Sequence, residues 1–64
     1  MDLKQFDNKE VVIVSVNGRI FCGKVSDYFY PDENNLGVES IVVDTKSGSL
    51  IEFTEEDIAS IEIV

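Results

Sequence analysis

The stretch VVIVSVNGRIFCGKVSDYFYP, residues 11–31, joins two apolar runs through Asn17 and Gly18. Its β-branched and aromatic residues favour strands. Asn-Gly is the dipeptide most favoured in two-residue type I′ turns, because both central positions need positive φ. The stretch therefore predicts an antiparallel hairpin of residues 10–16 and 19–30, with Asn17 and Gly18 at its turn.

A glycine, Gly23, lies in the middle of the second apolar run. An interior glycine weakens a strand unless a bend, a bulge or a close backbone approach requires it. We therefore expect the second strand to curl at Gly23. Pro31 has no N–H to donate, so it ends the pairing, and PDENNLG at residues 31–37 predicts an exposed loop.

Three shorter strands are predicted after this loop, at residues 38–45, 50–53 and 59–64, with KSGS as the turn between the first two. Residues 2–6 can form one helical turn. Thr54 stands at a helix N-cap position with Asp57 three residues later, which predicts one tight helical turn before the last strand.

The predicted fold class is all-β: a five-stranded SH3-like (Sm-like) barrel with a short helical turn before the last strand, in a single small domain of residues 1–64. Closing the sheet removes most strand edges and lets a short chain bury its apolar residues. We expect the barrel to bury Val12, Val14 and Val16. Ile61 and Ile63 share one face of the last strand, and Ile58 fills the barrel end.

At 64 residues the chain is near the lower size at which a core alone holds a fold. The lone Cys22 excludes an internal disulfide, and without histidine the commonest ligand of structural zinc is missing. We expect Cys22 to be a small packed residue. With no long apolar stretch and no signal-peptide pattern, the sequence predicts a cytoplasmic protein.

The net charge of −8 is unevenly distributed. Residues 1–30 hold four acidic and four basic side chains, whereas residues 31–64 hold nine acids and only Lys46. An acidic half repels phosphate backbones and anionic lipid, and it attracts basic surfaces. We therefore expect a basic protein surface as the partner and no membrane contact.

Enzymatic and metal-dependent functions are not predicted. The chain has no histidine and no nucleophile-elbow, P-loop or dinucleotide motif. Residues 32–43 align with a calcium loop at Asp32, Asn34 and Gly37, but Leu36 and Val43 stand where oxygen ligands are required. We predict no cofactor and no metal.

The apolar strand, NG turn, IFCGKV, SIVVDT and closing DIASIEIV resemble the Sm-like branch of SH3-like barrels over nearly the whole chain. The matching positions are Gly18, Gly23, Ile58, Ile61 and Ile63. The resemblance implies five bent strands and, in family members that bind RNA, a site in two loops. Here Asp27 with Asn34 or Asn35 only loosely matches the first RNA-binding loop, and LIEFTEEDI is acidic where the second carries Arg-Gly or Lys.

A second similarity is to the Rof family, acidic members of the same barrel class that inhibit the terminator Rho. SVNGRIFCGKVSD and VESIVVD are similar to its outline. By that analogy an acidic barrel occupies a basic surface that normally binds nucleic acid.

The leading hypothesis is a non-enzymatic, acidic protein-interaction module. Its expected aromatic contacts at the rim are Tyr28 and Tyr30, and the alternative is that these rings cap the barrel end. Its expected acidic contacts lie in the second half of the chain: Glu52, Glu55, Glu56 and Asp57. The alternative is an Sm-like RNA-binding homo-oligomer that uses Lys4, Lys9, Arg19, Lys24 and Lys46. Copies would then pair through the terminal IEIV or the third strand.

Overall fold

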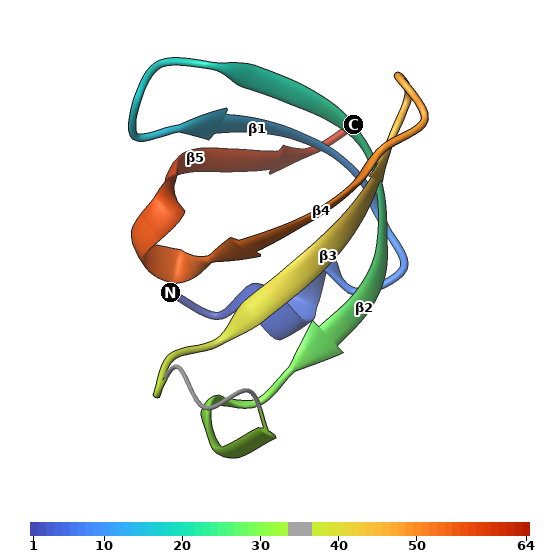
Figure 1. Ribbon diagram of the computed structural model, residues 1–64. Helices are drawn as coiled ribbons and strands as arrows, with labels where there is room; N and C mark the ends of the chain where they lie inside the picture. The colour runs from blue at the N-terminus through green and yellow to red at the C-terminus, as the bar shows by residue number, and fades with distance from the viewer. Residues whose placement is uncertain (34–36) are drawn as a thin grey trace.

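A computed structural model describes residues 1–33 and 37–64. Its strands are β1 (Glu10–Ser15), β2 (Ile20–Phe29), β3 (Ser40–Thr45), β4 (Leu50–Thr54) and β5 (Ile58–Ile63), and its 3-10 turns are η1 (Leu3–Phe6), η2 (Pro31–Glu33) and η3 (Glu55–Asp57). The strands form one antiparallel sheet in the order β4-β3-β2-β1-β5, which curls into a small barrel (Figure 1). The predicted fold class is confirmed.

The core is formed by inward-facing residues of the strands together with Leu3 and Phe6 of η1. In β1, Val11 and Ile13 point inward, whereas Val12 and Val14 are half-buried on the outer face. Val16 lies beyond the strand and is 67% exposed. The predicted burial of Val12, Val14 and Val16 is therefore wrong, because an unbroken apolar run contains no period of two that distinguishes its faces.

The first hairpin closes through a three-residue loop, so the predicted two-residue turn is wrong. The Ser15 N–H donates to the Arg19 carbonyl at 2.8 Å, and the Gly18 N–H donates to the Ser15 carbonyl at 2.9 Å. Gly18 has a φ of 86°, while Asn17 keeps a negative φ. The Asn17 side chain accepts from the Arg19 N–H at 3.1 Å and from the Ser15 hydroxyl, which holds the turn.

The β3–β4 hairpin repeats this loop. The Thr45 N–H donates to the Ser49 carbonyl and the Gly48 N–H to the Thr45 carbonyl, both at 2.9 Å. Ser47 takes the place of Asn17, with its hydroxyl 2.9 Å from that of Thr45. The barrel therefore contains two hairpins of the same construction.

Gly23 allows the strong curvature of β2 that Figure 1 shows. It is paired with Val11 of β1 and Thr45 of β3, and its inner face is buried. A Cβ at this position would overlap the carbonyl oxygen of Asp44 and lie 2.8 Å from the Thr45 Cα. The predicted curl is present, and the close approach of the β3 backbone is the reason that the position requires glycine. A register shift between Val25 and Asp27 bends the strand further.

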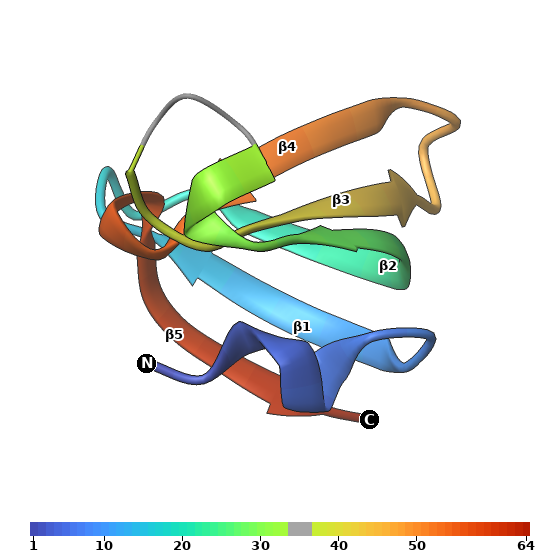
Figure 2. The same ribbon diagram turned by 90° about the horizontal axis from the view of Figure 1, so that it is seen from below.

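The two predicted helical turns are present at opposite ends of the chain. η1 lies across the lower end of the barrel and inserts Leu3 and Phe6 into the core (Figure 2). η3 is followed by Ile58, which is 5% exposed and fills the barrel end as predicted. The Thr54 N–H and hydroxyl both donate to the Asp57 carboxylate, at 2.9 and 3.1 Å, and fix the tight turn.

Among residues 1–33 and 37–64, the sheet leaves two unpaired edges, those of β4 and β5, because these strands stand at the ends of the strand order. β3 lies between β2 and β4, so the third strand cannot pair with a neighbouring molecule as predicted. The terminal strand β5 keeps such an edge.

Gly23→Ala is expected to lower the free energy of unfolding by about 3 kcal/mol, because the added methyl group must displace the β3 backbone. Urea denaturation followed by far-UV circular dichroism measures the change. Gly48→Asn is the matched control, with an expected loss within about 1 kcal/mol, since asparagine tolerates a left-handed conformation. Equal stability of Gly23→Ala and the unmodified protein would contradict the close approach.

Candidate interaction site

The predicted carboxylates lie along the connection between the two edge strands. Glu52 is on β4, and Glu55, Glu56 and Asp57 form η3. After Lys46 the chain contains five acidic residues and no lysine or arginine. Since this segment builds β4, η3 and β5, both unpaired edges belong to the acidic part of the chain.

Three of these four acids also have structural roles. Asp57 caps η3 through Thr54. Glu52 accepts a 2.7 Å hydrogen bond from the Ser40 hydroxyl of β3, and Glu55 lies 3.5 Å from the terminal ammonium. Glu56 is exposed.

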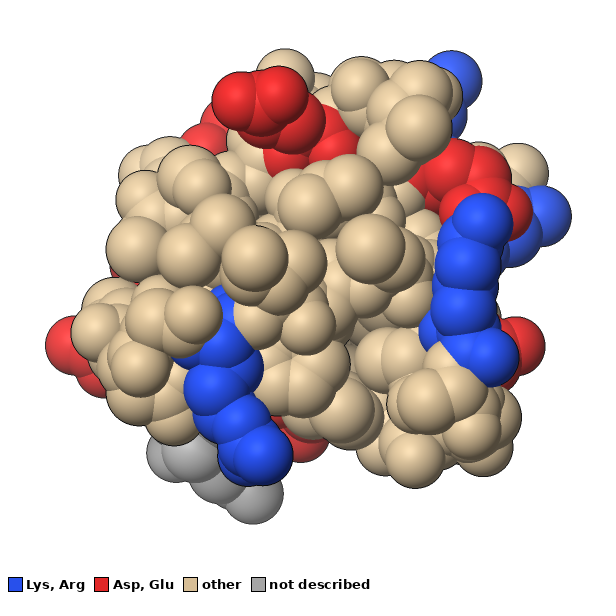
Figure 3. All heavy atoms as spheres, turned by 90° about the horizontal axis from the view of Figure 1, so that it is seen from above, with Lys and Arg blue, Asp and Glu red and all other residues tan. Residues whose placement is uncertain are grey.

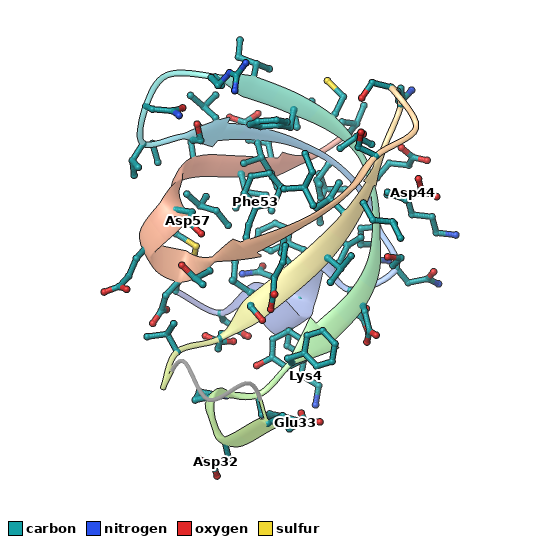
Figure 4. The ribbon with its side chains drawn as sticks, viewed as in Figure 1. Lys4, Asp32, Glu33, Asp44, Phe53 and Asp57 are labelled. Carbon is teal, nitrogen blue, oxygen red and sulfur yellow. The ribbon has the colours of Figure 1, made fainter. Side chains whose placement is uncertain are left out.

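A groove with a volume of about 200 Å³ lies between the first hairpin loop, β4 and η3. Val16 and Arg19 line it from the hairpin, and Phe21 lines it from β2. Glu52 and Phe53 line it from β4, and Asp57 from η3. The last two residues are labelled in Figure 4.

The groove combines an aromatic contact with charges of both signs. The Phe21 and Phe53 rings meet edge to face with centroids 5.2 Å apart. Two of the predicted acidic residues, Glu52 and Asp57, line the groove together with Arg19, although the Glu52 carboxylate points to the outer face of β4 and accepts from Ser40. Sequence reasoning missed Phe21 and Phe53 and did not place Arg19 beside the acidic residues, because no local pattern shows that the start of β2 faces the end of β4.

The predicted aromatics Tyr28 and Tyr30 lie at the other end of β2 and do not line the groove. Their rings meet edge to face with centroids 5.2 Å apart. Tyr28 packs against the core, whereas Tyr30 is 48% exposed. The Lys4 ammonium donates to the Tyr30 hydroxyl at 3.0 Å, which raises the pKa of Lys4.

Glu39 connects three separate segments. One carboxylate oxygen accepts from the Tyr28 hydroxyl at 2.7 Å and from the Leu3 N–H at 3.2 Å. Its main-chain carbonyl accepts from the Glu55 N–H at 3.2 Å. The hydrogen bond to Glu39 is the main reason why the pKa of Tyr28 rises to about 12. Its neighbours are distant in sequence, so sequence analysis did not identify Glu39.

The basic side chains are spread rather than gathered. Lys24 stands opposite Glu10 and Asp44 on the outer face of the sheet. Figure 3 shows Lys and Arg side chains separated by a wide uncharged surface on the upper end of the molecule. Cys22 is exposed, so its predicted packing is wrong: it lies on the outer face of β2 opposite Val12.

The remaining site predictions concern metals and the loop after β2. Within residues 1–33 and 37–64, no group of three His, Cys, Asp or Glu side chains is placed to hold a metal ion. Asn34, Asn35 and Leu36 lie outside the described residues.

In the described part of the chain, no helix has the length and apolar character needed to cross a membrane.

Comparisons of the chain with protein-family models, with curated proteins and with solved structures found no match. The function is therefore argued from the geometry and charge of the site.

Tyr28 is expected to ionise near pH 12 in the folded protein, against the ordinary value of 10.0. Because the folded state holds the proton more tightly than the unfolded state, stability is expected to fall as the pH rises from 10 towards 12. Absorbance titration of Tyr30→Phe, which leaves Tyr28 as the sole tyrosine, measures the midpoint. Glu39→Gln should move that midpoint back towards 10, and an unchanged midpoint would contradict the hydrogen bond.

Proposed function

We propose that this protein is a non-enzymatic, acidic interaction module that binds a basic surface on a protein partner. The observation that carries the proposal is the location of the acidic segment: it contains both unpaired strand edges and one wall of the groove. Complementary charge speeds encounter and selects against acidic partners.

The expected contact surface has two parts. Asp57 faces the groove, Glu52 lies on the outer face of β4, and Glu55 and Glu56 extend the negative charge along η3. The exposed ring of Tyr30 adds an aromatic contact near η1, where Lys4 holds its hydroxyl. We infer from the resemblance to Sm-like and Rof proteins that the partner handles nucleic acid.

Glu55→Lys combined with Glu56→Lys reverses the charge of η3, so that it repels a basic surface. This variant is expected to lose its retention of basic proteins from nuclease-treated lysate of the source cells. Mass spectrometry of the retained proteins measures the effect. Asp7→Lys with Asp27→Lys changes the net charge equally in the balanced half of the chain, and this control should retain the partner. Undiminished retention by the Glu55 and Glu56 variant would reject the acidic contact.

The second candidate is an Sm-like, RNA-binding homo-oligomer. It is favoured by the unpaired edges of β4 and β5, which two copies can join through main-chain hydrogen bonds. Its cations would be the dispersed lysines and Arg19.

The two candidates differ in their response to salt. RNA binding should weaken steeply as salt rises, with a logarithmic slope of about −0.7 for each phosphate contacted on a single strand. Fluorescence anisotropy with a labelled single-stranded RNA, at salt concentrations from roughly 50 to 200 mM, measures this slope. Saturable binding with this slope, by a protein that elutes as an oligomer, would favour RNA over a protein partner.

A further inference from the structure

We propose that the acidic half binds an extended, basic segment of its protein partner, which adds as a strand to the unpaired edge of β4 and places one Lys or Arg side chain in the groove. This inference rests on the proposed function and specifies the form of the partner. Strand addition supplies affinity through main-chain hydrogen bonds and selectivity through side-chain pockets.

The main-chain groups available on β4 follow from its pairing with β3. Hydrogen bonds from Thr45 N–H to the Ser49 carbonyl and from Glu55 N–H to the Glu39 carbonyl stand at the two ends of this ladder. In an antiparallel pair, alternate residues of a strand direct their N–H and C=O groups to the same neighbour. Residues 51 and 53 therefore face β3, and the main-chain groups of Leu50 and Glu52 face away from it.

The end of the available edge is also defined. The Thr54 N–H would be the next outward donor, but it already donates to Asp57 at 2.9 Å. An added strand therefore pairs with residues 50–53. β5 has an unpaired edge as well, but no β5 residue lines the groove, so only β4 combines an edge with a side-chain pocket.

The pocket follows from the alternation of side chains along a strand. A residue of the added strand opposite Phe53 points to the inner side of the sheet, where the groove lies. The stem of a lysine or arginine can lie against the Phe21 and Phe53 rings, with its head at the Asp57 carboxylate. The Glu52 side chain points to the outer face of β4, where it accepts from the Ser40 hydroxyl, so Glu52 contributes its main chain to the edge. Arg19 on the hairpin side repels that head and directs it towards η3.

The negative charge of the acidic segment favours a basic strand at the β4 edge. Residues 47–64, which form β4, η3 and β5, carry five acids and no base. An added strand must approach these acids closely, so an acidic or uncharged segment is disfavoured relative to a basic one.

The test uses the full chain and an acetylated, amidated heptapeptide of alternating lysine and valine as the probe. Amide hydrogen exchange is read by NMR with and without saturating peptide. Exchange at Leu50 and Glu52 is expected to slow about tenfold or more, because their N–H groups become hydrogen-bonded. Exchange at Ile61 and Ile63 of β5 should not change.

Three variants separate the pocket from general attraction. Asp57→Asn is expected to weaken peptide binding about tenfold, since it removes the charge that meets the lysine head, while its amide oxygen still accepts from Thr54 and keeps η3 in place. Arg19→Gln should strengthen binding about threefold by removing a like charge. Glu62→Gln is the matched control, because Glu62 pairs with Val12 on the outer face of β5, and its affinity should stay close to that of the unmodified protein.

A peptide with N-methyl groups on alternate residues gives an independent test of the main-chain contact. Methylating the amides that face β4 should abolish binding, and methylating the other set should preserve it. Slowed exchange at Leu50 and Glu52 together with this dependence on the methylated set supports the proposal.

The outcomes that overturn it are distinct from failure of the proposed function. Binding without slowed exchange, or equal losses for Asp57→Asn and Glu62→Gln, refutes strand addition and leaves a basic partner bound elsewhere. If the Leu50 amide exchanges more slowly as the protein concentration rises, with no peptide present, a second copy of the chain occupies the β4 edge. Absence of peptide binding also refutes strand addition, and the charge-reversal experiment then decides the proposed function by itself.

Discussion

The structure depends on the close approach of the β3 backbone to Gly23. β2 pairs with β1 on one side and β3 on the other, so both halves of the barrel meet along this strand. Any side chain at Gly23 would meet the main chain of Asp44 and Thr45. The absence of a Cβ lets β2 curve enough for Phe21 to reach Phe53 and for the acidic turn to lie beside the first hairpin.

Much of this fold could be predicted from local patterns. The five strands begin and end within about two residues of their predicted limits. The turn before the last strand was expected from Thr54 and Asp57, and a turn was also expected at residues 2–6. The faces of β1 could not be predicted, because residues 11–14 are all apolar and the hairpin loop sets the register. Asn17 and Gly18 indicated the hairpin correctly, but the dipeptide also suits a three-residue loop with glycine at its last position.

For the candidate site, only the acidic composition of the segment could be predicted from the sequence. The acidic segment was evident from the sequence, and the structure adds that Glu52 and Asp57 share a groove with Phe21, Phe53 and Arg19. These residues come from three parts of the chain, and their proximity depends on the closure of the sheet. The tyrosines form a separate cluster with Lys4 because β2 is long enough to carry its two ends to different parts of the barrel.

Glu39 links segments that are distant from one another in the sequence. Its carboxylate holds the start of η1 and the hydroxyl of Tyr28, while its carbonyl holds the first residue of η3. The Met1 ammonium also lies 3.5 Å from the Glu55 carboxylate, so a second contact joins the N-terminal segment to η3. On the proposed function, ordering of η3 by a partner is therefore coupled to docking of the N-terminal turn, and substitutions at the first residues of the chain should alter affinity at the acidic surface through thermodynamic linkage.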